Sequence, residues 1–494
     1  MTELQSTESR ASVRHQAQRV RRWPELLVGL AILVWGVYQS FWNIAAANLN
    51  ADEPTYLQAG WNYLHGDFSS NLEHPPTAKF LIGLAQVAFG EGALAPRLLV
   101  GIIGLLGAVI IYFWLRLEVG WIGAAAAAGF WIVLPHGVEG DVRLDRFAVL
   151  EPFMVFFAIA AFAAAWMWFR TRSWWWLVLS AIAMALSVTS KVSTVVLLPA
   201  ILLLPLLEKR WRDTILGGIG YLAVFAAVFV VVYLPLGLVS SVRYMLEYQW
   251  AHAETGHSVV VAGVVTSTPP WWANLLFSVE GMGIAASIVL GVGAVAAFFG
   301  QRIRLPLFLG SAVVLLWIFY LGISTVALKH YYYAWVWLFC ALAGIGIAAL
   351  IGRPTDAPGG VRARSRPALL ATRAVAAALI ALAVVSGFGA SAAVAAIRPS
   401  GVALVAPALA ERGVTDGRIF AAGLAPWEYI PYFEERHTTD PADPDITVYA
   451  VKQSPRFPVD PSVKALLADH ASEFDVVVLD DVTLYIHRSA ESAG

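Results

Sequence analysis

Long apolar runs recur along this chain of 494 residues, and they restrict its fold more than any other feature. A helix needs roughly 17–25 apolar residues to cross the hydrocarbon core of a bilayer. The chain is 59% hydrophobic and only 14% charged, which favours an all-α polytopic membrane protein over a soluble domain of this size. We expect eleven transmembrane spans, at residues 25–46, 94–115, 121–137, 147–168, 174–190, 192–207, 214–236, 281–300, 305–327, 333–351 and 373–397.

The lysines and arginines between these spans predict the orientation. If the N-terminus lies inside, eighteen basic residues fall in inner segments and seven in outer loops. Basic residues accumulate on the cytoplasmic side, so residues 1–24 should be a cytoplasmic tail and 353–372 a cytoplasmic linker loop. The first span is longer than a secretory signal core of roughly 7–15 residues, so we interpret it as a signal anchor. The outer loops are then 47–93, 136–146 and 237–280, with shorter turns between them.

The chain changes character at about residue 399. This last segment holds fifteen of the thirty-four acidic residues. Strand-like runs such as "ITVYAV" alternate with helical ones such as "PSVKALLADHASEF", which predicts a small extracytoplasmic α/β domain over 399–494. The net charge of −1 gives no reason to expect a nucleic-acid partner. The chain has a single cysteine, Cys340, so it cannot form an intrachain disulfide.

The first outer loop reads "LNADEPTYLQAGWNYLHGDFSSNLEHPPTAK" over residues 49–79. Asp52 can cap a helix that Pro54 begins. Apolar residues then recur at helical spacing over 54–66 and again over 76–89, in stretches too short to span. We therefore expect two helices along the membrane surface. They would hold five polar residues at the outer interface: Asp52, Glu53, Glu73, His74 and Lys79.

Other charged residues are predicted at the same level. Arg146 and Glu151 stand at the start of the fourth span, and Lys191 lies in the turn "SVTSKVST". A carboxylate inside a span is costly unless it is paired, so we expect Glu151 to pair with Arg146 or Lys191. The fifth outer loop, "ALKHYYY", adds Lys329 and His330.

These motifs resemble one family of membrane enzymes. "DEPTY…EHPPTAK" is similar to the first outer loop of GT-C glycosyltransferases that use polyprenyl-phosphate sugars, namely protein O-mannosyltransferases and lipid A aminoarabinose transferases of the bacterial type. "RFAVLEPFMVFF" is similar to their Arg-then-acid motif, with Glu151 where an Asp is commoner. "TSKVSTVVLLP" and "LKHYYYAWVWLF" match later loops. The resemblance covers about 25–350 and implies a GT-C transmembrane domain over 25–397.

The resemblance implies transfer of a sugar from a polyprenyl-phosphate donor to an acceptor hydroxyl at the outer face of a bacterial plasma membrane. The acceptor is a protein, a glycan or a lipid, and membrane lipids surround the enzyme. Such a reaction needs a carboxylate to take the acceptor's proton and cations to hold the leaving phosphate. Asp52 would be the base, and Glu53 would orient it or perturb it through like charge. The candidate phosphate holders are Lys79, Arg146, Lys191 and Lys329, with Glu73, His74, Glu151 and His330 in support.

Simpler interpretations stay open from the sequence alone. Asp52 and Glu53 could be a solvated helix cap, and Arg146 could be an anchor whose charge reaches the interface. A divalent metal bound by Glu73, His252 and His257 is a candidate cofactor, although histidines in surface loops are common. The whole chain could instead be a transporter, a lipid flippase or a non-catalytic docking protein. A transporter should show ionisable groups at mid-membrane and inverted repeats, and neither is visible here.

Overall fold

A computed structural model describes residues 23–50, 52–138, 142–300, 302–352 and 365–488. Most of the predicted tail at 1–24 and most of the linker at 353–372 lie outside these ranges. Within them, eight helical segments are long and apolar enough to cross a membrane, and the chain is a multi-pass membrane protein. These segments are α2 (Trp23–Phe41), α5 (Leu94–Val133), α6 (Leu150–Thr171), Asp213–Leu236 with α9 (Gly218–Tyr233), α11 (Ala273–Ala297), Arg304–Ile323 with α12 (Arg304–Trp317), α13 (Tyr333–Ile351) and α14 (Arg366–Ala396).

All eleven predicted runs are helical, but they are not equivalent. The second and third are separate helices, which the range of α5 joins across a break at Gly120, where φ is 76°. Trp131 donates to the carbonyl of Gly104 at 3.0 Å, so the two halves of α5 pack against each other. The fifth run is the shorter helix α7 (Trp174–Val188). The sixth is a series of short turns, because Pro199 and Pro205 each lack the N–H that a regular helix would use. Its parts are η2 (Val192–Leu197), α8 (Leu198–Leu203) and η3 (Leu204–Glu208).

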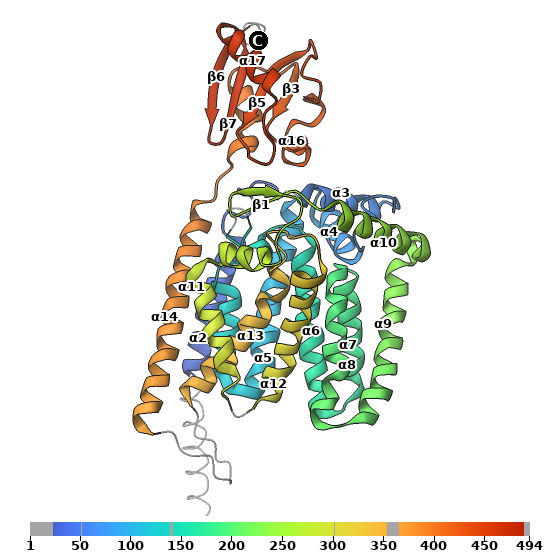
Figure 1. Cartoon of the computed structure of the whole chain (residues 1–494), viewed down its shortest axis with the longest axis vertical. Coiled ribbons are helices and arrows are strands. Elements are labelled where there is room, and N and C mark those ends of the chain that lie inside the picture. Colours follow the sequence, from blue (N-terminus) through green and yellow to red (C-terminus); the bar gives the residue numbers. More distant parts are fainter. Residues whose placement is uncertain (1–22, 51, 139–141, 301, 353–364, 489–494) are drawn as a thin grey trace, which may run out of the picture.

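Helix α13 lies at the centre of the membrane domain, packed against α5 and α11 (Figure 1). Glycines permit this close approach. A Cβ atom at Gly346 would lie 1.9 Å from the carbonyl oxygen of Gly293 in α11, and one at Gly344 would lie 2.5 Å from Ala127 in α5. Small residues that let helix backbones meet are typical of membrane helix pairs.

One end of the membrane domain carries the loops predicted to be outside. Helices α3 (Glu53–Leu64) and α4 (Thr77–Phe89) lie there side by side, in contact at Gly60 and Gly83 (Figure 1). They match the two surface helices expected from the sequence. Helix α10 (Leu238–Thr255) and the hairpin β1 (Val259–Val261) and β2 (Val264–Thr266) lie at the same end. The predicted capping bond is absent: Asp52 occupies the N-cap position of α3, but its side chain does not accept a helix N–H.

The C-terminal α/β domain lies beyond this same end, joined by α14 (Figure 1). Its sheet has the order β4-β3-β5-β7-β6, with β3 parallel to β4 and β5, and β7 antiparallel to β5 and β6. The predicted strands and helices are present, whereas the sequence did not predict β4 or α16. The elements are α15 (Val405–Glu411), β3 (Arg418–Ala422), α16 (Pro426–Phe433), β4 (His437–Thr438), β5 (Ile446–Lys452), α17 (Pro461–Asp469), β6 (Phe474–Leu479) and β7 (Val482–His487).

Candidate active site

Three charged or polar side chains from distant parts of the chain meet at the end of the membrane domain that carries α3 and α4. Glu151 at the start of α6 forms an ion pair with Lys191 from the turn after α7. His330, from the segment before α13, places its Nε2 atom 3.3 Å from a Glu151 oxygen and 3.4 Å from the Lys191 nitrogen. The predicted pairing of Glu151 with Lys191 is thus confirmed. The Lys191 nitrogen also lies 5.3 Å from the centre of the Tyr331 ring.

The charge of Asp52 acts on this cluster and on Tyr56. Burial raises the pKa of Tyr56 well above its ordinary value, and the negative charges of Asp52, Glu151 and Glu73 raise it further. The charge of Asp52 also acts on Lys191. Asp52 is exposed at the first turn of α3, where the helix dipole favours a negative charge. The site therefore combines one exposed carboxylate with a half-buried cluster of Glu151, Lys191 and His330.

The loop of the His-Pro-Pro motif is fixed to the Lys191 turn. Thr77 donates its backbone N–H to the carbonyl of Thr189 at 2.9 Å, and the two hydroxyls lie 2.6 Å apart. Burial and the nearby charges of Lys191 and Lys79 lower the pKa of His74 to about 3. His74 is therefore neutral at physiological pH and packs edge-on against Tyr56.

The structure does not give Glu53 the role expected from the sequence. Its side chain is completely buried and accepts hydrogen bonds from Arg97 at 2.8 and 2.6 Å. It also accepts from the backbone N–H of Ala148 at 2.8 Å and of Asn50 at 3.1 Å. Arg97 balances the charge of Glu53, so Glu53 is a structural partner that holds the loop together.

Two of the four predicted phosphate holders also have other partners. Arg146 is buried and donates to the carbonyls of Gln39 and Trp42, both at 2.6 Å, at the end of α2. Lys79 is buried and donates to the carbonyls of Asn71 and of His74, the latter at 2.8 Å. Burial lowers the pKa of Lys79 to about 7, so at neutral pH this side chain is charged only part of the time. Both residues donate to backbone carbonyls and so anchor loops in this structure.

Lys329 lines a cavity of about 530 Å³ together with Glu280 of α11 and Ser386 of α14. Of the predicted cations, Lys191 is the one in contact with both Glu151 and His330.

The predicted metal ligands do not form a metal site. Among the residues that the structure describes, no three His, Cys, Asp or Glu side chains are grouped as metal ligands. Glu73 accepts from Asn71 at 2.7 Å, and His257 accepts from Arg456 at 2.9 Å. The rings of His252 and His257 lie 5.3 Å apart, without a carboxylate completing the set.

Sequence reasoning missed two buried arginines. Arg97 pairs with Glu53, and Arg143 pairs with Asp145 through contacts of 2.8 and 2.5 Å. A signal was present in each case. Arg97 is a charge inside an apolar run, and the motif "DVRLDRF" places Arg143 two residues before Asp145. The first signal does not identify the partner, because Arg97 and Glu53 are 44 residues apart.

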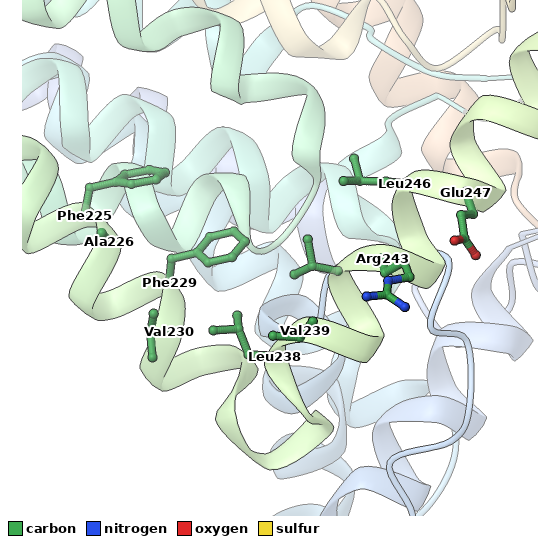
Figure 2. Close-up of a pocket in the computed structure, with 10 residues that line it drawn as sticks. Phe225, Ala226, Phe229, Val230, Leu238, Val239, Arg243, Leu246 and Glu247 are labelled. Atoms are coloured by element: carbon green, nitrogen blue, oxygen red, sulfur yellow. The ribbon is translucent and has the colours of Figure 1, made fainter.

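An apolar groove of about 620 Å³ runs between α9 and α10. Figure 2 shows the side chains of Phe225, Phe229 and Leu238 pointing into it, with Arg243 and Glu247 toward one end. Farther along α10, Gln249 donates to the carbonyl of Glu73 at 3.2 Å. One helix therefore connects the groove with the loop that carries the site.

Comparisons with known proteins define the class of this fold. The structure of ArnT from Cupriavidus metallidurans in the apo state matches with a TM-score of 0.60 and 18% identity, covering 96% of this chain and 99% of that one. ArnT bound to undecaprenyl phosphate matches with a TM-score of 0.59 and 17% identity, covering 94% and 97%. The oligosaccharyltransferase AglB from Archaeoglobus fulgidus, in complex with an inhibitory peptide and a dolichol-phosphate, matches with a TM-score of 0.57 and 10% identity, covering 87% and 70%.

The chain thus has the GT-C type of fold. Within that class, residues 73–236 match the model of the family described as dolichyl-phosphate-mannose-protein mannosyltransferase. No curated protein matches the chain in sequence. The resemblance to GT-C enzymes of the ArnT and protein mannosyltransferase type, predicted from the loop motifs, is confirmed by the family match and the shared fold.

Proposed function

We propose that this protein is a membrane glycosyltransferase that moves a sugar from a polyprenyl-phosphate donor to an acceptor hydroxyl at the outer face of the plasma membrane. The observation that carries the proposal is an exposed carboxylate, Asp52, whose charge acts on Lys191 of the half-buried Glu151–Lys191–His330 cluster. The names of two structural relatives add support, since ArnT was solved with undecaprenyl phosphate and AglB with a dolichol-phosphate.

Asp52 has the properties of a general base in this reaction. It accepts the proton of the acceptor hydroxyl while that oxygen attacks the anomeric carbon of the sugar. The bond between the anomeric carbon and the phosphate oxygen breaks, and its electron pair leaves with the polyprenyl phosphate. Negative charge therefore increases on the leaving phosphate, and a cation placed there stabilises the transition state.

Lys191 is the cation best placed for that task. Its ammonium group has three N–H donors, of which Glu151 accepts one. Glu151 and the Tyr331 ring hold the ammonium in position. His330 lies within reach of both members of the ion pair and offers a second group toward the phosphate. In this proposal Lys79 and Arg146 shape the loops and do not touch the donor.

The groove between α9 and α10 suits the hydrocarbon chain of the donor. Its walls are apolar, and the segment containing α9 is among the spans least covered by protein. Burial of apolar surface in such a groove stabilises a lipid chain by roughly 25 cal/mol per Å². Arg243 lies toward one end of the groove, and α10 continues to the site at Gln249.

The proposed orientation places the N-terminus in the cytoplasm and the C-terminal domain outside. It is supported by the excess of basic residues in the predicted inner segments. The loops that carry Asp52, Lys191 and His330 lie at the same end of the membrane domain as the C-terminal domain (Figure 1). Nucleotide sugars are not supplied on that side, so a lipid-linked donor fits the position of the site.

The direct test uses the purified full-length protein in lipid nanodiscs. It is given a polyprenyl-phosphate sugar and a panel of acceptors comprising Ser/Thr peptides, glycans and lipids. We expect release of polyprenyl phosphate and a glycosylated acceptor without any nucleotide. Use of nucleotide sugars alone would overturn the proposal in favour of a cytoplasmic-donor transferase. Movement of the intact lipid across a bilayer without cleavage would indicate a flippase.

A further inference from the structure

The C-terminal domain and the first outer loop are joined by hydrogen bonds just before Asp52. Leu49 donates its backbone N–H to the hydroxyl of Tyr432, in α16, at 2.7 Å. Asn48 and Ser400 bind each other reciprocally: the Asn48 amide donates to the Ser400 carbonyl at 2.9 Å, and Ser400 donates its N–H to the Asn48 side chain at 3.2 Å. These bonds connect residues more than 350 positions apart in the chain.

The same loop segment is held from the membrane side by Arg97. This guanidinium donates to the carbonyls of Ile44, Ala47 and Asn48 at 2.9, 3.0 and 2.9 Å, and it pairs with Glu53. Residues 44–50 therefore lie between Arg97 on one side and the C-terminal domain on the other.

Tyr432 lies at the contact between the C-terminal domain and this loop segment. Burial raises the pKa of its hydroxyl, and the charge of Glu53 raises it further. The hydrogen bond from Leu49 and the charge of Arg97 lower it. The neighbouring residues of α16 behave differently, because Tyr429 and Phe433 are buried in the core of the C-terminal domain. Only one aromatic side chain in this turn of α16 thus bonds to the membrane domain through its hydroxyl.

We infer that Tyr432 is a positioning residue: through Leu49, the C-terminal domain fixes the loop that sets the location of Asp52. The inference rests on the proposed function, in which Asp52 is the base. A base works only when it is held within a fraction of an ångström of its productive position, and displacement by about 1 Å can lower the rate by about 100-fold. If the Tyr432 hydroxyl is removed, the half-buried N–H of Leu49 loses its acceptor. Residues 44–50 can then shift.

The test is Tyr432→Phe in the full-length protein, compared with Tyr485→Phe. Tyr485 lies on β7 and packs against Phe474 inside the same domain, so it controls for the loss of a hydroxyl. For Tyr432→Phe we expect kcat to fall between about 5- and 100-fold with the KM for the polyprenyl-phosphate sugar unchanged. Hydrogen exchange should rise in peptide 44–50 of this variant, whereas Tyr485→Phe should match the wild type in both measurements.

A second variant tests the same joint from the other side. Asn48→Ala leaves the Tyr432 ring and its packing in place, and it should raise exchange in peptide 44–50 and lower kcat. Combining Tyr432→Phe with Asp52→Asn should reduce the rate no further than Asp52→Asn alone, because both changes act on one base.

The outcomes distinguish the positioning role of Tyr432 from the proposed function. If Asp52→Asn is inactive while Tyr432→Phe and Asn48→Ala keep normal kcat, the positioning role is overturned and the proposed function stands. Unchanged exchange in Tyr432→Phe also overturns the positioning role. If Asp52→Asn turns over like the wild type, the proposed function itself is wrong.

Discussion

Two neighbouring carboxylates in this protein have opposite surroundings, and the difference decides what each can do. Asp52 is exposed at the start of α3, whereas Glu53 is completely buried against Arg97. A buried carboxylate is retained only when a cation and hydrogen bonds compensate for its lost hydration. Glu53 has these partners, and both of its oxygens accept hydrogen bonds from them. Asp52 is the member of the pair that an incoming hydroxyl can approach.

We predict that Asp52→Asn lowers turnover by about 100-fold or more, because an amide cannot accept the proton. Stability should stay within about 0.5 kcal/mol of the wild type, since the side chain is exposed and makes no capping bond. Turnover of the polyprenyl-phosphate sugar and thermal unfolding in detergent measure the two effects. Turnover within a few-fold of the wild type would remove Asp52 from the mechanism.

Glu53→Gln should behave in the reverse way. The change leaves the buried guanidinium of Arg97 without its counter-charge, which costs about 3–5 kcal/mol. We expect a lower unfolding temperature and, through the displaced loop, reduced activity. Asp52→Asn is the matched control, because it also replaces a carboxylate by an amide, one position earlier in the chain. A Glu53→Gln protein as stable as the wild type would contradict the structural role.

At the scale of elements, hydropathy predicts most of this fold because span length is set by the bilayer. All the predicted runs are helical, and the second and third are the two halves of α5 on either side of Gly120, as predicted. The sequence analysis did not predict that the sixth run is a series of short turns. The surface helices α3 and α4 were predicted because an apolar face repeated over stretches too short to span.

The groove between α9 and α10 yields a prediction for the donor. Val242→Trp places a large ring among the lining residues and should raise the KM for a polyprenyl-phosphate sugar by about tenfold. Val231→Trp is the control, because Val231 is 68% exposed on α9 and does not line the groove. Both variants are assayed with one long-chain and one short-chain donor. An equal KM for both variants and the wild type would exclude the groove as the chain site.

At the scale of the whole molecule, the site consists of contacts that no local pattern specifies. The motifs indicated Asp52, Glu151, Lys191 and His330, but Lys191 and His330 are 139 residues apart and meet only through the packing of the helices. The same pattern-based reasoning assigned a phosphate to Arg146 and Lys79. It could not show that both side chains already donate to backbone carbonyls. Every residue has a carbonyl, so the sequence does not show which of them lie near a given side chain.

The final prediction concerns the direction in which the molecule crosses the membrane. The chain has one cysteine, Cys340, which is buried, so an introduced cysteine can be labelled almost without background. Val478→Cys, on the exposed face of β6, should react in intact cells with a maleimide that cannot cross the membrane. Arg212→Cys, exposed directly before the span Asp213–Leu236, should react only after the cells are permeabilised. The expectation follows from the excess of basic residues in the segments predicted to be inside. Labelling in the reverse pattern would place Asp52 and Lys191 in the cytoplasm, where nucleotide sugars are available, and would remove the reason for a lipid-linked donor.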